Sequence, residues 1–465
     1  MHRRRAGDER RVREPRGLSR LALTAPAPRV YRQDVADREL DVVVFGATGV
    51  TGRRVAAYLS ERAAEIGLRW AAAARDADRA RRLLDGIGVG APEMIVADVS
   101  DRASLARMAA RTKVVLDLVG PYTLYGRPVI EACVAQGAHY VDLTGEMPFV
   151  RGIIEDLHGA AVDAGVKVVQ VCGFEALPPD LLVALAAERA REQWRDGLVA
   201  ADVAVAFAPP PGLPRPSDGM SGGTFQSLST VAGDEHAAQI ADPAVLITDP
   251  AVAAAVRRVS PIGLAPRRGA DGAVIAPMTP APFINPAVIH RTIALRAAAE
   301  GTPAEPLRYR EGMAIEGGAA SAPVRWAIAG ALSATQVGLR GLARARPSVR
   351  RPIAGALARV GPSSGFGPAP ERLEGWRWTM TVHARTSGGR EFDVGLEADG
   401  HPGYLATARM LGEAGILLAE DGATPHVAGC LTPAVALGTA SAPRFARAGV
   451  RFHTGVRDAV ASGAR

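Results

Sequence analysis

Cysteine is scarce in this sequence, and patterns that would give it structural chemistry are absent. The 465 residues contain only three cysteines, Cys133, Cys172 and Cys430, which lie far apart and form no CxxC pair. This odd, scattered set argues against a disulfide framework and a thiolate zinc site, so we expect buried free thiols in a reducing compartment. The histidines show no HxxxH or HExxH spacing, so no metal site is predicted.

Long hydrophobic runs and a secretory leader are also lacking. No uninterrupted apolar run reaches about 18 residues, and the arginine-rich N-terminus has no apolar segment of its own. Neither a membrane span nor a signal peptide is predicted, and the default location is the cytoplasm. With 48% apolar and 22% charged residues, the composition is that of a globular protein with two or three folding units.

The net charge of +7 is concentrated in two segments. Residues 1–39 carry eleven arginines against six acids, and residues 317–370 carry seven arginines and no acid. The rest of the chain is net acidic, so nucleic-acid binding is not predicted. We interpret residues 1–39 as a disordered basic leader, because they lack a lasting hydrophobic periodicity.

An apolar run at 41–45 leads into the glycine-rich segment GATGVTG and then into helical spacing. This strand, turn and helix predict a dinucleotide site, in which Gly46 bends the chain, Gly49 admits a pyrophosphate and Gly52 lets helix and strand pack. The spacing is GxxGxxG, and a tight corner without a ligand is the alternative. The cofactor-binding residues expected here are Gly46, Thr48, Gly49, Val50, Thr51 and Gly52.

The ends of the next two strands indicate which dinucleotide binds. Arg75 follows the second predicted strand, where an NAD-specific fold carries an acid. A guanidinium there favours the 2′-phosphate of NADP(H), with Arg79 as a helper, and the alternative is a solvated arginine. Asp98, after the strand 94–97, suits the adenine edge, or it caps the next helix, as Ser100 also could.

A fourth predicted strand runs into the segment GPYTLYG at 120–126. Because strand carboxyl ends line the cofactor crevice, Gly120, Pro121 and Tyr122 are expected to contact the nicotinamide end of the cofactor. The phenols of Tyr122 and Tyr125 are either proton donors or side chains that only pack against the cofactor.

The pattern over the whole chain predicts an α/β protein with two domains. Alternating strands and helices at 40–176 predict a Rossmann domain with a doubly wound parallel sheet. Period-two patterns return between 177 and 402 and predict a second α+β domain built on an antiparallel sheet. The proline-rich residues 260–286 are interpreted as covering loops, and residues 403–465 as a helical segment that packs back on the Rossmann domain.

The acid-free stretch contains one helical pattern with a basic end. Apolar and small residues between Ile328 and Leu342 recur at spacings of four and three, and arginines follow at once. Three interpretations remain open: a core helix, membrane-surface contact through 325–351, or docking to an acidic protein.

Together, these motifs resemble the saccharopine dehydrogenase-like oxidoreductases, and within them the trans-acting enoyl reductases of polyketide and lipid assembly. The resemblance covers residues 40–455 and rests on GATGVTG, Arg75, GPYTLYG, HYVDLTGE and CGFEALPPDL. Residues 220–224, 403–408 and 430–434 resemble later motifs of the subgroup. One departure is Glu175-Ala176, where relatives usually carry an aspartate followed by a serine.

The resemblance implies an NADPH-dependent enzyme that reduces an activated double bond in a lipid-like or carrier-bound acyl chain. The partner would be an acyl carrier protein or a polyketide synthase, with Tyr122 and Tyr125 as candidate donors and Glu175 behind them. The alternatives are a saccharopine-type amine dehydrogenase, which needs a cationic pocket, and a regulatory protein that binds NADP(H) without turnover. A homo-oligomer and a peripheral location at the inner face of the plasma membrane are further expectations.

Overall fold

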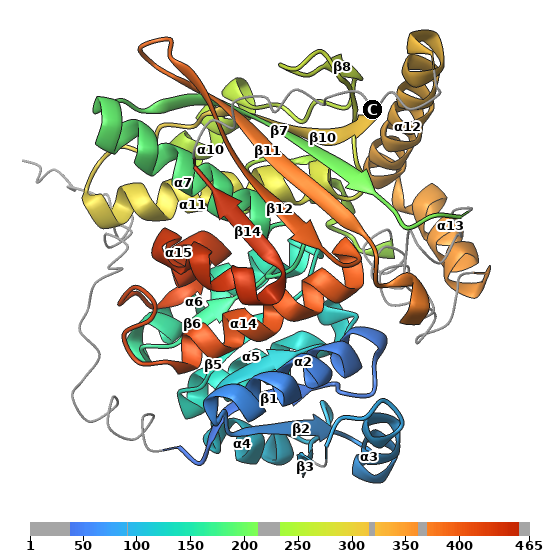
Figure 1. Cartoon of the computed structure of the whole chain (residues 1–465), viewed down its shortest axis with the longest axis vertical. Helices are drawn as coiled ribbons and strands as arrows, with labels where there is room; N and C mark the ends of the chain where they lie inside the picture. The colour runs from blue at the N-terminus through green and yellow to red at the C-terminus, as the bar shows by residue number, and fades with distance from the viewer. Residues whose placement is uncertain (1–37, 91, 213–232, 316–320, 361–369, 455–465) are drawn as a thin grey trace, which may run out of the picture.

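The computed structural model describes residues 38–90, 92–212, 233–315, 321–360 and 370–454. Two seven-stranded sheets lie one above the other in this part of the chain, the first below and the second above in Figure 1. Most of the predicted leader and the motif at 220–224 lie outside the described residues. Arg38 is described and donates to the carbonyl of Ala109 at 3.1 Å, so the folded part includes the last residues of the predicted leader.

The first sheet is parallel throughout, with the order β13-β6-β5-β4-β1-β2-β3. Apart from β13, this is the strand order of a doubly wound dinucleotide-binding sheet. The predicted fold class is therefore confirmed. The strands are β1 (Leu40–Phe45), β2 (Trp70–Ala74), β3 (Glu93–Val96), β4 (Thr112–Asp117), β5 (His139–Asp142), β6 (Lys167–Val169) and β13 (Gly429–Leu431).

Helices cover both faces of this sheet. Val42 and Val44 of β1 pack into the cluster that contains residues of α2 and α14, whereas Val43 and Phe45 pack into the cluster of α4, α5 and α6. Both faces of β1 are thus buried, which explains its unbroken apolar sequence. The helices are α2 (Val50–Ile66), α3 (Ala77–Asp85), α4 (Arg102–Ala110), α5 (Tyr122–Gln136), α6 (Met147–Asp163) and α14 (Thr407–Ala419).

The second sheet has the order β14-β12-β11-β7-β10-β9-β8. Its pairs are antiparallel as predicted, except that β7 and β10 run parallel. Parallel neighbours need a long crossover, and the chain between β7 and β10 supplies it with α10 (Pro250–Val259) and α11 (Asn285–Glu300). The strands are β7 (Leu198–Ala208), β8 (Arg267–Arg268), β9 (Val274–Ala276), β10 (Arg308–Ile315), β11 (Arg377–Thr386), β12 (Glu391–Asp399) and β14 (Val450–His453).

Two segments differ from the sequence-based expectation. Residues 260–286 are not only covering loops, because β8 and β9 form a hairpin that extends the second sheet, followed by the turn η2 (Ala281–Phe283). These strands are too short to show a period-two pattern. After residue 402 the chain contributes strands to both sheets as well as helices, including α15 (Pro433–Leu437) and η5 (Thr439–Ala448). The domain boundaries at 176 and 402 stay a prediction.

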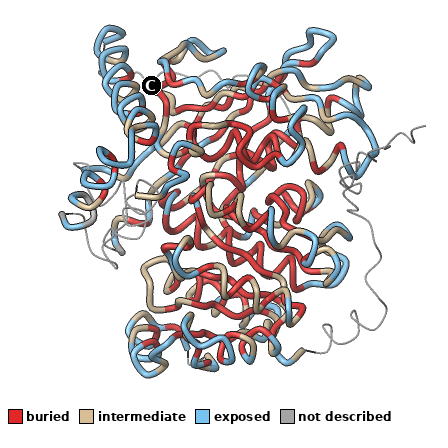
Figure 2. The backbone as a smooth tube through the Cα atoms, turned by 180° about the vertical axis from the view of Figure 1, so that it is seen from behind, coloured by how far each residue is buried: buried red, intermediate tan, exposed pale blue. Residues whose placement is uncertain are grey.

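One continuous core joins the two layers. Helix α7 (Leu177–Trp194) lies between them, and its buried side chains share a cluster with Val44 of the first sheet and Trp378 of the second. Figure 2 shows this buried interior running through both layers. The two sheets are thus held together by apolar packing as well as by chain connections.

Helices α12 (Ala322–Arg344) and α13 (Pro347–Val360) stand at the edge of the second sheet (Figure 1). The core-helix interpretation of this segment is wrong, because only Ala329, Gln336 and Ala343 of α12 are buried (Figure 2). Its apolar periodicity serves contacts along one side of the helix, with β9 and with the turn η1 (Ala237–Ala241). Among the helices the structure describes, none combines the length and apolarity needed to cross a membrane.

Candidate cofactor and catalytic site

The glycine corner joins β1 to α2 at the carboxyl edge of the first sheet. Gly46 has φ +89°, a left-handed conformation that favours glycine. Gly49 is the N-cap of α2 with extended backbone angles, and no side chain caps the helix. The first turn of α2 also carries no acid, so its N–H groups and dipole present an anion-binding end.

Steric contacts distinguish the roles of the three glycines. A Cβ on Gly46 would lie 2.9 Å from Val119 Cγ2, and a Cβ on Gly52 would overlap the carbonyl oxygen of Gly46. The fold itself therefore requires these two. A Cβ on Gly49 would meet only the Gly46 oxygen, at 3.5 Å, which is an ordinary contact. The small size of Gly49 is thus not needed for packing, and the corner fits the close approach of a pyrophosphate.

The other predicted corner residues, Thr48, Val50 and Thr51, are partly buried. Val50 packs against the cluster of Leu373, Tyr404 and Leu405. The motif at 403–408 therefore contacts the corner from the C-terminal part of the chain.

Arg75 and Asp98 are brought to the same edge, after the neighbouring strands β2 and β3. Hydrogen bonds from the backbone and hydroxyl of Ser100 lower the pKa of Asp98, and the nearby charge of Arg75 lowers it further. Arg75 is exposed, as a residue that binds a ligand phosphate must be. The alternative prediction, that Asp98 or Ser100 caps the next helix, is wrong. Asp101 caps α4, and its carboxylate accepts bonds of 3.0 and 3.2 Å from the backbone N–H groups of Ala103 and Ser104.

The segment after β4 is held by an acid that sequence reasoning missed. The buried carboxylate of Glu146 accepts bonds from Tyr122 N at 3.0 Å and Thr123 N at 2.7 Å, and so caps α5. Gly120 is exposed and Pro121 is buried. The sequence signal for Glu146 was an acid in the short segment Thr144-Gly145-Glu146 that follows the predicted strand at 139–143.

The two candidate phenols have different surroundings. The buried Tyr122 hydroxyl donates to the Asp117 carbonyl at 3.0 Å and accepts from Leu143 N at 3.4 Å. These bonds join the ends of β4 and β5 and favour a structural role for Tyr122. Tyr125 is 39% exposed. The catalytic roles of both residues stay predictions.

A buried pair of carboxyl groups lies beneath Tyr122. The Tyr140 hydroxyl is 3.1 Å from Asp117 Oδ2 and 3.0 Å from Asp142 Oδ2. A phenol has one proton, so the second contact requires a proton on a carboxyl group. Burial raises the pKa of both aspartates, and their mutual repulsion raises that of Asp117 further. The three groups therefore titrate as one unit. The sequence signal for this pair was the presence of acidic residues within otherwise apolar predicted strands.

Glu175 lies on a constrained turn after β6. Val171 has φ +61°, which is unusual for a β-branched residue, and its N–H donates to Asp142 Oδ1 at 3.1 Å. On the other side, Phe174 N donates to Thr407 Oγ1 at 3.1 Å. The turn is thus fixed both by the first sheet and by the C-terminal segment. Burial raises the pKa of the partly buried Glu175.

The inner face of the second sheet opposes this turn. The ring of Phe174 makes an edge contact with Trp378 at 5.0 Å and a tilted contact with Phe207 at 6.0 Å. On β10 of the same sheet, Glu311 Oε2 accepts bonds from the Tyr309 hydroxyl and from Asn285 Nδ2, both at 2.6 Å. Acidic groups from both layers, Glu175 and Glu311, are close enough to interact. No pattern in the order of residues groups these side chains.

Known proteins match both the corner and the whole chain. The saccharopine dehydrogenase NADP binding domain matches residues 42–169. A trans-acting enoyl reductase of Mycobacterium ulcerans is 33% identical over 432 residues, covering 89% of this chain and 97% of the relative. A protein of the same name from Mycobacterium tuberculosis is 33% identical over 435 residues, covering 90% and 98%. The apo saccharopine dehydrogenase (L-Glu forming) of Saccharomyces cerevisiae covers 89% of this chain and 99% of its own, with 13% identity and a TM-score of 0.48.

The glycine corner and the matching domain define an NADP-dependent oxidoreductase of the saccharopine dehydrogenase-like class. The chain belongs to the trans-acting enoyl reductase family, since relatives of that name share a third of its residues over nearly their whole length. The predicted cofactor, NADP(H), and the family resemblance are confirmed.

Proposed function

We propose that this protein reduces the activated double bond of an acyl chain that a carrier protein or polyketide synthase holds. The names of its relatives support this reaction class. The corner of Gly46, Gly49 and Gly52, with Arg75, would hold NADPH, which supplies a hydride when bound. The protein's own residues must then exclude water and deliver a proton.

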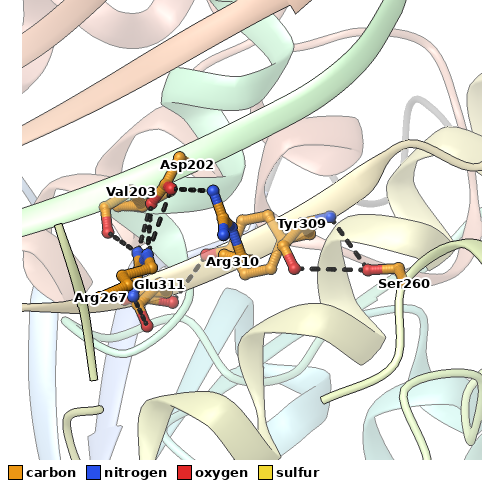
Figure 3. A network of polar contacts seen from close by, with 7 residues as sticks. All are labelled: Asp202, Val203, Ser260, Arg267, Tyr309, Arg310 and Glu311. Carbon is orange, nitrogen blue, oxygen red and sulfur yellow. Dashed lines mark hydrogen bonds and ion pairs between the residues drawn. The ribbon is translucent and has the colours of Figure 1, made fainter. Parts of the chain in front are cut away.

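The direction in which the arginine side chains of the second sheet point supports an acyl chain, rather than an amine dehydrogenase substrate, as the hydride acceptor. Along a strand, successive side chains point to opposite faces, so Arg310 points away from the face of Tyr309 and Glu311. Arg310 Nη2 pairs with Asp202 Oδ2 at 2.7 Å, and Arg267 pairs with the same carboxylate (Figure 3). The inner face offers aromatic rings and acids to the substrate. This favours a neutral acyl chain over the carboxylate-rich substrate of an amine dehydrogenase.

A cofactor-oxidation assay tests this function. We expect the protein to oxidise NADPH rapidly when it is mixed with an α,β-unsaturated acyl thioester, followed by the loss of NADPH absorbance in a stopped-flow instrument. The saturated thioester of the same length is the control and should cause no oxidation. Oxidation by a keto acid with an amino acid, and not by the thioester, would identify an amine dehydrogenase. Bound NADPH that no acceptor oxidises would identify a regulatory protein.

We also propose that α12 and α13 contact an anionic membrane surface. Residues 317–370 contain no acid, and Arg344, Arg346 and Arg351 are exposed. Arg350, in contrast, is buried and bonds to the Ala343 carbonyl at 3.2 Å. Exposed bulky side chains beside these cations favour a lipid surface over an acidic protein. The exposed apolar residues are Val324, Trp326, Ile328, Val337, Val349 and Ile353.

Charge reversal tests the membrane contact. Each basic residue near an anionic bilayer contributes about 1 kcal/mol, so Arg344→Glu with Arg346→Glu should weaken binding to phosphatidylglycerol vesicles at least ~30-fold. Arg81→Glu with Arg82→Glu makes the same change in net charge on α3 and should have little effect. Vesicle flotation measures both. Equal binding by the two variants, or no binding by the native protein, would contradict the proposal.

A further inference from the structure

Two buried oxygen atoms, one on β10 and one at the start of α11, have no hydrogen-bond partner within the described residues. They are Glu311 Oε1 and Asn285 Oδ1. Glu311 is 5% exposed and Asn285 is fully buried, so bulk water does not satisfy these atoms. Buried polar atoms in folded proteins are nearly always paired, and an exception indicates a missing water or ligand.

The other half of the Glu311 carboxyl group is firmly held. Oε2 accepts bonds from both the Tyr309 hydroxyl and Asn285 Nδ2. Tyr309 N in turn donates to Ser260 Oγ at 3.0 Å (Figure 3). These bonds fix the orientation of the carboxyl group. They also stabilise negative charge on Oε2 once the proton has left, whereas Oε1 remains the free position for a proton.

Glu311 lies where the two layers meet. Asn285 begins α11 directly after Ile284, and Ile284 Cδ1 packs so closely on the loop after β5 that a Cβ on Gly145 would be 2.7 Å from it. Glu175, on the turn after β6, interacts electrostatically with Glu311. The carboxyl ends of β5 and β6 are part of the edge that lines a cofactor crevice in this type of sheet.

We propose that Glu311 is the proton donor of the reduction and that Tyr309 and Asn285 are its positioning residues. The inference rests on the proposed enoyl reduction. The carbon–carbon π bond breaks as the hydride from the cofactor forms a C–H bond at the β carbon, which leaves an enolate. The Glu311 O–H bond then breaks, its proton forms a C–H bond at the α carbon, and Glu311 becomes a carboxylate until solvent reprotonates it.

The surrounding groups keep this acid protonated near neutral pH. Burial, the largest cause, and the charge of Glu175 raise the pKa of Glu311, and the net value is about 7. The bonds from Tyr309 and Asn285 and the charge of Arg267 act in the opposite direction. Since the protonated form is the donor, turnover should be constant below about pH 7 and fall tenfold per pH unit above it.

Glu311→Gln tests the donor because glutamine keeps the shape and removes the acid. We expect NADPH affinity within about twofold of the native value and a 10²- to 10³-fold lower rate of NADPH oxidation in a single turnover with the unsaturated thioester. The fall in rate above about pH 7, the alkaline limb of the pH profile, should also be lost. Tyr309→Phe should cost less activity and move the limb to higher pH, since the bond that lowers the pKa is gone. Glu175→Gln removes the rival acid. It should keep the pH dependence but move the fall in rate to lower pH, because the charge that raises the pKa of Glu311 is gone.

Infrared spectroscopy gives a readout that needs no substrate. The difference spectrum between the native protein and Glu311→Gln should contain a protonated-carboxyl band at pH 5 that disappears near pH 7, because the protonated Asp117 and Asp142 pair is present in both proteins and cancels. Absence of this band at pH 5, or equal turnover by the native protein and Glu311→Gln, overturns the inference alone. A Glu175→Gln variant that loses the limb while Glu311→Gln keeps it also overturns it. If the native protein reduces no acyl thioester, the proposed function fails and the inference fails with it.

Discussion

Gly49→Ala should weaken NADPH binding about 100-fold or more while the protein stays folded. The backbone of Gly49 has φ −70° and ψ 165°, which alanine adopts freely, and the new Cβ would contact only the Gly46 oxygen at 3.5 Å. The methyl group would instead occupy the approach to the N-terminus of α2. Losing two charge-assisted bonds there costs about 3 kcal/mol or more. Fluorescence titration measures the Kd, and thermal unfolding measures the stability.

Two other glycines serve as controls for this variant. Gly52→Ala should lower the stability, because its Cβ would overlap the Gly46 carbonyl. Gly152→Ala, on α6, should change neither property appreciably, since the nearest side-chain atom, Arg127 Nη2, is 3.9 Å away. Native NADPH affinity in Gly49→Ala would show that the pyrophosphate does not lie over this corner.

Arg75→Ala should reduce NADPH affinity about 10- to 100-fold and leave NADH affinity nearly unchanged. Paired bonds between a guanidinium and a phosphate contribute about 1.5–3 kcal/mol, and only NADPH carries the 2′-phosphate. Arg75 is exposed at the end of β2, so the substitution leaves no buried cavity. Titration with both cofactors gives the ratio of affinities.

Arg79→Ala is the matched control for Arg75, because it removes an exposed arginine of the same edge. Its backbone, rather than its side chain, bonds to Asp76 at 2.9 Å, so the fold should tolerate the change. We expect a smaller loss of NADPH affinity. An equal loss for NADH and NADPH in Arg75→Ala would show that Arg75 does not select the phosphate.

The cofactor edge was the part of the site most open to prediction. Its residues follow directly from local order: a strand, a turn with glycines, and a helix, then Arg75 and Asp98 at the next two strand ends. Parallel strands bring their carboxyl ends to one edge, so the periodicity alone groups these residues. Their individual binding roles remain predictions that the variants above test.

The grouping of the buried acids between the two sheets could not be predicted from the sequence in this way. Tyr309 and Glu311 are close to Asn285 and Glu175 only because the crossover between β7 and β10 returns beneath the second sheet. Likewise, α12 has the apolar spacing of a core helix, yet most of its residues are exposed and only three are buried. A periodic pattern says which side of a helix is apolar, but not whether another element covers it.

The order of residues by itself determined the doubly wound first sheet, its glycine corner and the choice of cofactor. Each of these depends on strands, turns and helices that follow one another directly in the sequence. The tertiary structure alone decided that β13 and β14 join different sheets, that Tyr122 bridges two strand ends, and that Glu311 lies close enough to Glu175 for their charges to interact. The pairing of β13 with β6 and the approach of Glu311 to Glu175 join segments more than 100 residues apart, so they are set by how the two sheets pack. The bonds of Tyr122 join closer residues, but they depend on the direction in which its side chain points, which the order of residues does not reveal.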